Sequence, residues 1–194
     1  MSQSFIEAFS DKNSEFDLAQ VADAKNYLGN EFLAWLWYSA EKSQCEYPMG
    51  SGQKTVRFWV DDRLLMESSR YKGHTQLLTG GVPSKSREAA VALANGRIVK
   101  EMRLGLHVKS VGDFSVLLKG ETLEPASLRL PALPEQEENE LDSRMALVEV
   151  FSQALDILFS EFMKVRVSHS WVESVLPQMR DWIQTRNDSA VTLH

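Results

Sequence analysis

The side chains that could carry out catalysis are few, and their spacing predicts no reactive centre. The chain has 4 histidines and a single cysteine, Cys45, which lies beside Glu46 with nothing that marks it as a nucleophile. The histidines show no metal-ligand spacing, and no HExxH motif, phosphate-binding P-loop or GxSxG elbow occurs. These are His74, His107, His169 and His194. We therefore expect a non-enzymatic protein with no catalytic residues, no metal and no cofactor; an unrecognised type of enzyme is the alternative.

Two dipeptides have residue types that suit a reactive or binding loop. Asp61-Asp62 is a carboxylate pair, but adjacent acids between strands are mostly turn formers. Gly80-Gly81 precedes a predicted helix, where backbone N–H groups and the cations Lys85 and Arg87 would favour a phosphate. The alternative for Gly80-Gly81 is an ordinary loop before a helix start.

Cations are concentrated in the middle of an acidic chain. Residues 54–119 hold 12 Lys and Arg against 6 Asp and Glu, whereas the whole chain has 21 against 27 and a net charge of -6. The rest of the chain therefore has a formal charge of -12. Such asymmetry is typical of a polyanion-binding face, or of acidic parts that fold back onto a basic part.

A long helix is predicted near the N-terminus, over 17–42, with Ser14 and Asp17 as possible caps. Residues 31–38 are apolar around the whole helix, which is typical of a buried core helix; an aromatic platform for bases is the alternative. Gly29 is expected either to kink this helix or to let another backbone come close.

Alternation of apolar and polar residues predicts the strands that follow. They are expected at 55–60, 64–69, 74–79, 98–109 and 114–119, with an edge strand at 123–130. Asp61-Asp62 is predicted to form a tight hairpin turn, and 98–109 to be the longest strand. A short helix capped by Ser84 is predicted over 85–94 and ends at Asn95-Gly96.

The C-terminal third is predicted to be helical. Residues 131–140 contain prolines and glutamates typical of an exposed linker. The helix predicted over 141–167 has an apolar stripe wide enough for burial on two sides. Ser170 and Glu173 have the spacing of a capping box for a third helix, in which Pro177 is a first-turn residue or a kink.

The expected fold class is α+β. We predict an antiparallel sheet of about five strands with a short crossing helix, flanked by long N- and C-terminal helices. The helix-plus-sheet domain is expected to span 1–130, followed by the acidic linker at 131–140. The helical segment 141–194 is expected to pack on that domain or on a partner.

Targeting and membrane signals are not evident. Residues 1–10 lack a basic region followed by an apolar run, and the longest apolar block, 32–38, is too short to span a bilayer. A single cysteine allows no internal disulfide, which fits a reducing compartment. A cytoplasmic location without membrane contact is expected, nucleoid-associated if the chain binds DNA.

Part of the chain, about 28–131, resembles the later half of the bacterial recombination-associated RdgC family. The shared pattern is a strand, a short Ser-capped helix that ends at glycine, a long basic and aliphatic strand, an aromatic-led strand and a Leu-rich run. The residues that carry it are Leu28-Gly29-Asn30-Glu31-Phe32-Leu33-Ala34-Trp35-Leu36-Trp37-Tyr38, Leu77-Leu78, Ser84-Lys85-Ser86-Arg87-Glu88-Ala89, Ala94-Asn95-Gly96-Arg97-Ile98-Val99, Met102-Arg103-Leu104-Gly105-Leu106, Phe114-Ser115-Val116-Leu117 and 123–130.

The resemblance implies a non-enzymatic protein that binds duplex DNA without sequence preference. Proteins of that family form closed dimeric rings around duplex DNA and restrain RecA-mediated recombination. They are usually longer, with an additional N-terminal half. A role in recombination, phage replication or defence is therefore expected for this chain, as a homo-oligomer or as a subunit of a complex.

The polar faces of the predicted strands identify cations for DNA binding. If the polar faces of 55–60 and 98–109 lie on one side of the sheet, their cations form one surface, which loop and helix-start cations extend. The predicted DNA-binding residues are Arg57, Arg70, Lys72, Lys85, Arg87, Arg103 and Lys109. Their contacts to phosphates would be independent of base sequence and sensitive to salt. No recognition helix is visible, and Tyr71 is the best candidate for stacking on a base.

A protein-interaction subunit without DNA binding is the alternative function. It is favoured by the two apolar-rich helices, the acidic linker and the net negative charge. In this alternative, the basic strands contact acidic surfaces of a partner or of the chain's own helices.

Overall fold

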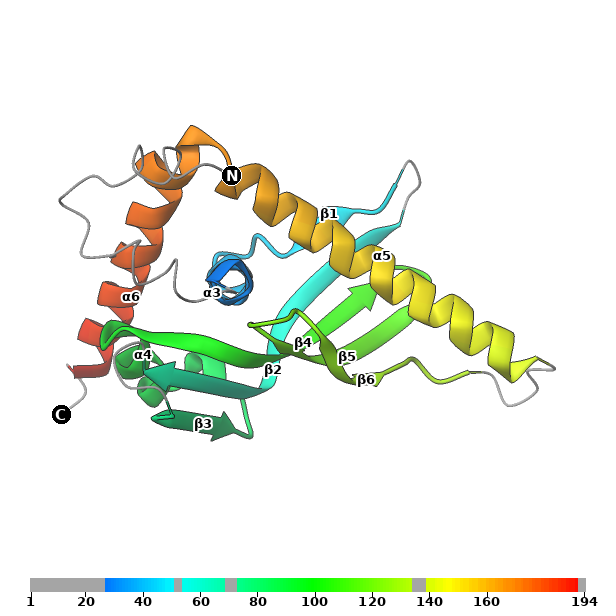
Figure 1. Cartoon of the computed structure of the whole chain (residues 1–194), viewed down its shortest axis with the longest axis horizontal. Coiled ribbons are helices and arrows are strands. Elements are labelled where there is room, and N and C mark those ends of the chain that lie inside the picture. Colours follow the sequence, from blue (N-terminus) through cyan, green and yellow to red (C-terminus); the bar gives the residue numbers. More distant parts are fainter. Residues whose placement is uncertain (1–26, 51–53, 69–72, 134–138, 192–194) are drawn as a thin grey trace.

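The computed structural model describes residues 27–50, 54–68, 73–133 and 139–191. They form an open antiparallel sheet with helices packed against it (Figure 1). In chain order the elements are α3 (Tyr27–Glu41), β1 (Glu46–Pro48), β2 (Thr55–Ser68), β3 (Thr75–Thr79), the 3-10 helix η1 (Pro83–Lys85), α4 (Arg87–Ala94), β4 (Arg97–Val108), β5 (Gly112–Lys119), β6 (Pro125–Arg129), α5 (Glu140–Arg166), the π-helical segment η2 (Trp171–Val175) and α6 (Leu176–Val191).

The predicted mixture of helices and an antiparallel sheet is confirmed, with six strands rather than about five. The strand order is β1-β2-β4-β5-β6, and β3 pairs with β2 as well. The additional strand is β1, whose three residues are too few to show an alternating pattern. The predicted helix start at 17–26, with its caps Ser14 and Asp17, lies outside the described residues.

The predicted hairpin at Asp61-Asp62 is wrong, because β2 runs straight through these residues. Val60 pairs with Leu104 and Leu64 pairs with Met102, so that three residues of β2 lie opposite one residue of β4. Such a bulge absorbs the extra residues without reversing the chain. At 14 residues β2 is therefore longer than β4, which has 12 and was predicted to be the longest strand.

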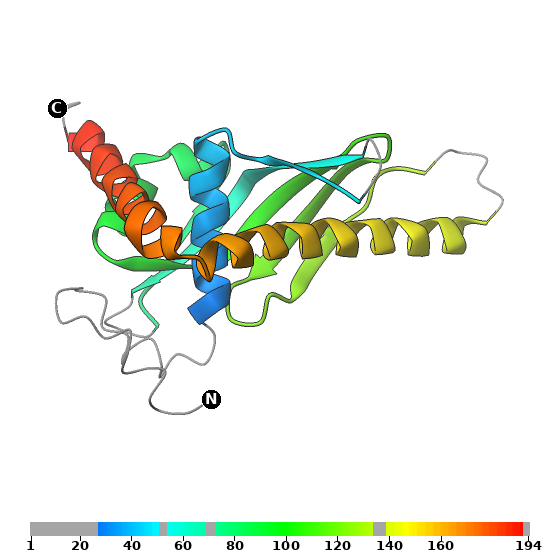
Figure 2. The same ribbon diagram turned by 90° about the horizontal axis from the view of Figure 1, so that it is seen from above.

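The core lies between one face of the sheet and the helices. Figures 1 and 2 show α5 crossing α3 on the same side of the sheet. The alternating apolar residues of β4 and β5 are buried, and so are the aromatic residues within 31–38 of α3, which confirms the core-helix interpretation of 31–38. These include Met102, Leu104, Leu106, Phe114, Val116, Phe32, Trp35 and Trp37.

Gly29 lets a neighbouring backbone come close, as one of its two sequence interpretations predicts. A Cβ atom added at Gly29 would lie 1.9 Å from the carbonyl oxygen of Gly120, in the turn between β5 and β6. Only glycine allows the N-terminal end of α3 to rest on that turn without displacing the main chain.

Two predicted helix caps differ in the structure. Ser86, not Ser84, caps α4: its Oγ accepts a hydrogen bond from the backbone N–H of Ala89 at 3.1 Å, and Ser84 is buried in η1. Ser170 makes no capping hydrogen bond; its hydroxyl lies 2.6 Å from that of Ser168. The predicted stop at Asn95-Gly96 is confirmed, with Gly96 at φ 72°.

The C-terminal helices join the same core. α5 matches the predicted helix at 141–167 and buries Phe151, Ala154, Leu158 and Phe162, and buried residues of η2 and α6 belong to the same cluster. Pro177 lies in the first turn of α6, directly after η2. Because proline has no N–H and clashes with the preceding turn, the wider π-helical segment accommodates it.

Candidate functional site

Two of the predicted cations, Arg57 and Lys109, lie together on the face of the sheet turned away from α3 and α5. Arg57 is opposite His107 in the pairing of β2 with β4, and the Lys109 N–H donates to the carbonyl of Thr55 at 3.0 Å. Both side chains are exposed, and neither has an ion-pair partner among the described residues, although Glu46 is the β1 neighbour of Arg57. We call Arg57 and Lys109 the Arg57 corner.

Arg103 lies on the same face but is occupied by an intramolecular ion pair. Its side chain is only 13% exposed, and its Nε lies 3.2 Å from the carboxylate of Asp62 in the bulge of β2. A guanidinium that is mostly buried and already paired is a poor ligand for a DNA phosphate. The cationic surface predicted to include Arg57, Arg103 and Lys109 is therefore reduced to Arg57 and Lys109 in the folded chain.

Other cations of the basic middle are paired as well. The pairs are Arg63–Glu101 at 3.2 Å, Lys119–Glu124 at 3.3 Å, and Lys100 with Glu67 at 3.0 Å and Glu121 at 3.3 Å. Most of these acids lie in or directly beside the basic middle. These pairs occupy several cations, but only Glu121 and Glu124 lie outside residues 54–119, so they offset two of the six excess positive charges counted there.

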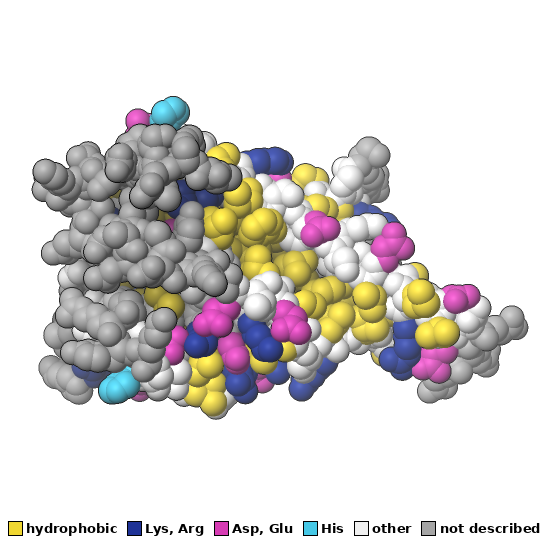
Figure 3. Space-filling model, in the orientation of Figure 1, with side chains coloured by type: hydrophobic (Ala, Val, Ile, Leu, Met, Phe, Trp, Pro, Cys, Tyr) yellow, Lys and Arg dark blue, Asp and Glu magenta, His cyan; other side chains and the backbone are white. Residues whose placement is uncertain are grey.

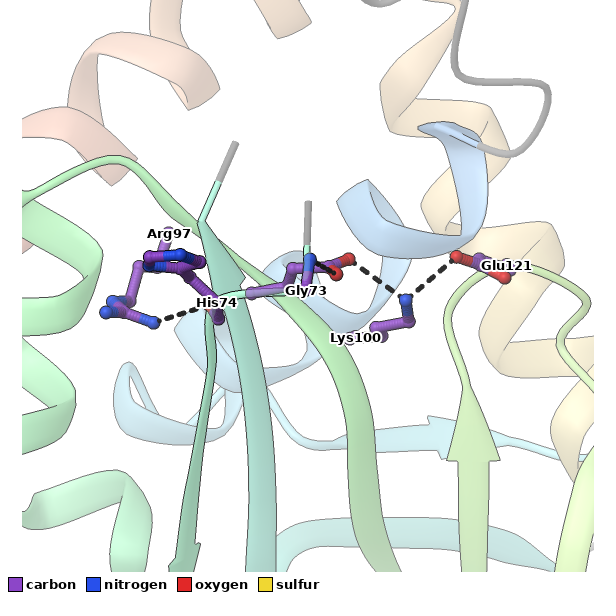
Figure 4. Close-up of polar contacts among 6 residues, drawn as sticks. Gly73, His74, Arg97, Lys100 and Glu121 are labelled. Carbon is purple, nitrogen blue, oxygen red and sulfur yellow. Dashed lines mark hydrogen bonds and ion pairs between the residues drawn. The ribbon is translucent and has the colours of Figure 1, made fainter. Parts of the chain in front are cut away.

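The loop that carries Arg70, Lys72 and Tyr71 lies outside the described residues, but its base is visible (Figure 4). The Gly73 N–H donates to Glu67 at 2.9 Å, and Glu67 also accepts from Lys100. This hydrogen bond is the main cause of the raised pKa of Lys100. β2 ends at Ser68, directly before these residues, whereas Arg57 lies near the start of that strand.

Lys85 and Arg87 are placed apart from the Arg57 corner. They lie in η1 and at the start of α4, a unit that packs against α6. The N-terminus of α4 offers little to a phosphate, because Ser86 already accepts from the Ala89 N–H and Glu88 lies in the first turn. The ordinary loop-and-helix interpretation of Gly80-Gly81 therefore fits the geometry better.

Trp59 is a site residue that was not predicted from the sequence, although it lies on the outward-facing side of β2. Its indole lies flat on Gly105 of β4: a Cβ atom at Gly105 would be 2.1 Å from the ring atom Cε2. The side chain remains 39% exposed. The sequence shows a tryptophan among polar residues of a strand. That a glycine lies beneath its ring follows only from the strand register.

A shallow depression of about 490 Å³ adjoins Trp59. Its lining residues are Ala40, Cys45, Arg57, Phe58, Trp59, His107 and Asp113. His107 Nδ1 lies 2.6 Å from Asp113 Oδ1, so this exposed histidine has a carboxylate partner. No group of three potential metal ligands occurs among the described residues. The depression suits a ligand with a flat apolar part and an anionic part.

A second candidate surface is an exposed apolar flank of α5. Leu141, Met145 and Val148 are 68%, 62% and 43% exposed. They lie on the N-terminal part of α5, which extends past the sheet in Figures 1 and 2. In Figure 3 hydrophobic side chains form a band that follows α5 across the visible face. We call Leu141, Met145 and Val148 the α5 flank.

Comparison with family models, curated proteins and solved structures found no match for the chain. Among the described residues, no helix combines the length and the apolar character needed to cross a membrane.

Proposed function

We propose that the chain is a non-enzymatic, sequence-independent duplex-DNA-binding subunit of RdgC-like type that acts in recombination, phage replication or defence. The observation that carries the proposal is the Arg57 corner: two exposed cations that have no ion-pair partner among the described residues, on the face of the sheet turned away from α3 and α5. The sequence resemblance supports the same function.

The geometry favours contacts to the DNA backbone over contacts to bases. A flat sheet face has no element that enters a groove, so Arg57 and Lys109 are expected to meet phosphates only. Each phosphate contact releases a counterion, so two contacts lower the affinity about tenfold between roughly 50 mM and 200 mM salt. A second copy of the chain in the complex would double the number of contacts.

Charge reversal at the Arg57 corner is expected to abolish most of this binding. For the double variant Arg57→Glu and Lys109→Glu, we expect at least about a tenfold loss of affinity for a duplex at roughly 50 mM salt. The measurement is fluorescence anisotropy of a labelled duplex at both salt concentrations.

The matched control is Lys164→Glu with Arg180→Glu, which changes the net charge by the same amount on α5 and α6, away from this face. The control is expected to bind nearly as well as the parent chain. Equal losses in both variants would show that net charge alone matters and would reject the Arg57 corner. Absence of duplex binding by the parent chain at the lower salt would reject the DNA function.

A protein-interaction subunit is the second candidate function, favoured by the α5 flank, and we assign a second copy of this chain as its partner. The apolar residues Leu141, Met145, Val148, Leu155 and Phe159 follow the alternating spacing of four and three residues found at a and d positions of coiled coils, with a serine in the remaining position. The N-terminal turns of this stripe have no covering element among the described residues.

Charges beside the stripe fit a parallel pair of α5 helices. With Met145 at position a, Arg144 occupies position g and Glu149 occupies position e. In a parallel dimer, g of one helix lies beside the following e of the other, so Arg144 and the copy's Glu149 have opposite charges. This complementarity is the reason for choosing a second copy over an unrelated partner.

Substitution of the α5 flank is expected to prevent dimerisation without unfolding the chain. The triple variant Leu141→Gln, Met145→Gln and Val148→Gln should be a monomer by sedimentation velocity, with an unchanged melting temperature because the three side chains are exposed. Val172→Gln, an exposed apolar residue on η2, is the control and should remain dimeric.

Charge swaps test the orientation of the pair. Arg144→Glu and Glu149→Arg should each weaken self-association, whereas an equimolar mixture of the two variants should dimerise, since both g–e pairs then become attractive. A monomeric parent chain, or a mixture that associates no better than either variant alone, contradicts the parallel pairing.

A further inference from the structure

We propose that Trp59 is a stacking platform for an unpaired DNA base, with the neighbouring phosphates bound by Arg57 and Lys109. The inference rests on the proposed DNA-binding function and adds a ligand class to it, namely single-stranded DNA. Three features of the sheet face carry it: the exposure of this one tryptophan, the way its ring is held, and the charges around it.

The exposure of Trp59 is unusual for this chain. The other four tryptophans are all buried in the core. They are Trp35, Trp37, Trp171 and Trp182. A large aromatic side chain left partly in water, on a face that otherwise carries polar residues, is typical of a binding site.

The indole is held in the orientation that stacking requires. Because Gly105 has no side chain, the ring of Trp59 lies against the backbone of β4 with one face covered and the other turned away from the sheet. A ring already positioned in this way loses little freedom when a flat group stacks on it. Every base has such a flat face, so the platform is tolerant of sequence.

The surrounding charges fit a nucleotide strand. Arg57 precedes Trp59 by two residues on the same face of β2, so one cation lies next to the ring, and Lys109, whose N–H donates to the carbonyl of Thr55, lies beyond Arg57. Two nearby carboxylates have polar partners: Asp113 with His107 at 2.6 Å, and Asp61 with the Ser115 hydroxyl at 3.3 Å. Aromatic rings with adjacent cations are the usual elements of single-strand binding sites.

The bases of an intact duplex are stacked on one another and cannot reach a flat ring on a sheet. The ligand that uses the platform is therefore single-stranded DNA or a frayed end. In this arrangement duplex and single strand share the phosphate contacts of the Arg57 corner, and only the single strand adds a contact to Trp59.

Tryptophan fluorescence of the full chain provides a direct test. Only Trp59 is exposed among the five tryptophans, so a base stacked on it should quench this component of the emission. We expect quenching by an oligothymidylate, none by a closed hairpin duplex, and no quenching in Trp59→Phe. For Trp59→Ala, we expect roughly a tenfold lower affinity for the oligothymidylate and unchanged affinity for the duplex.

Two further variants make the result specific. Gly105→Ala pushes the indole off the sheet without changing charge and should weaken single-strand binding alone. Leu77→Ala, at another exposed apolar residue of the sheet, should bind both probes as the parent chain does. Circular dichroism of each variant confirms that it is folded.

The outcomes separate this inference from the proposed function. Duplex binding with no quenching and with unchanged oligothymidylate affinity in Trp59→Ala overturns the platform alone. Equal weakening of both probes also overturns it, because the ring would then be a general contact. Quenching by the single strand without duplex binding supports the platform and overturns the duplex function. If neither probe binds, both proposals fail.

Discussion

Replacement of Glu41 by alanine is expected to destabilise the folded chain by about 3 kcal/mol and to loosen α6 from α3. The Glu41 carboxylate accepts hydrogen bonds from the indole N–H groups of Trp37 at 3.1 Å and Trp182 at 3.3 Å, and it is paired with Arg186. The Arg186 side chain is 15% exposed and also donates to the carbonyl of Ser84. Loss of the carboxylate leaves two buried indole N–H donors unpaired, and it leaves a mostly buried guanidinium without its counter-charge, with only the Ser84 carbonyl as hydrogen-bond acceptor.

Glu41, Arg186 and the two tryptophans form one cluster, which explains why a single substitution has so large an effect. The Arg186 guanidinium of α6 lies 5.5 Å from the ring of Trp182 on its own helix and 5.6 Å from that of Trp37 on α3, so it reaches α3 through Trp37 as well as Glu41. Removing one partner of a buried charge pair costs more than removing both, because the remaining charge is left without solvent or partner.

Urea unfolding followed by circular dichroism measures this prediction. The control is Glu140→Ala, which removes an exposed pair with Arg144 and should change stability by less than about 0.5 kcal/mol. The double variant Glu41→Gln and Arg186→Met should lose less than Glu41→Ala alone. Similar stability of Glu41→Ala and Glu140→Ala would contradict the role of the cluster.

The alternation of apolar and polar residues along the chain was sufficient to predict most strands of the sheet. The alternation in β4 and β5 depends only on which residues of one strand face the core, and Leu104 and Val116, on the apolar side of each pattern, are buried. The bulge in β2 could not be predicted in this way. Adjacent aspartates are common in turns, and only the pairing with β4 shows that the chain continues through them.

The candidate site was predicted in part, because charge counts along a chain omit pairing across strands. Arg57 and Lys109 were predicted on one face, and the register places them there. Arg103 was predicted on the same surface, but the carboxylate that pairs with it comes from the bulge in β2, which the residue pattern does not reveal. Trp59 was not predicted as a ligand contact, because the space that Gly105 leaves for its indole depends on the pairing of two strands.

The wide apolar stripe of the helix at 141–167 was predicted to be buried on two sides. One side, with Phe151 and Leu158, packs on the core. The other side remains exposed at Leu141 and Met145, so the expected oligomer contact stays a prediction that the dimerisation experiment tests. A pattern of apolar residues identifies which surfaces need cover, and the identity of the covering chain follows only from features such as charge complementarity.

Replacement of Gly29 by alanine is expected to destabilise the chain by about 2 kcal/mol, against the usual effect of this change in a helix. In the middle of an exposed helix, alanine is favoured over glycine by about 1 kcal/mol. Here the added Cβ would lie 1.9 Å from the carbonyl oxygen of Gly120, and a backbone atom cannot move aside as a side chain can. α3 must therefore shift relative to the β5–β6 turn, and overpacking of this kind outweighs the gain in helix propensity.

Gly120→Ala is the matched comparison, because its Cβ would meet the Oδ1 atom of Asn30 at 2.0 Å, the end of a side chain that can rotate. We expect Gly29→Ala to lower the urea midpoint more than Gly120→Ala, and Asn30→Ala to relieve the effect of Gly120→Ala but not that of Gly29→Ala. A lower urea midpoint for Gly120→Ala than for Gly29→Ala would mean that the β5–β6 turn moves more easily than the Asn30 side chain. A stabilised Gly29→Ala variant would show that α3 is not held against the β5–β6 turn, and the packing of its aromatic face on the sheet would then need another anchor.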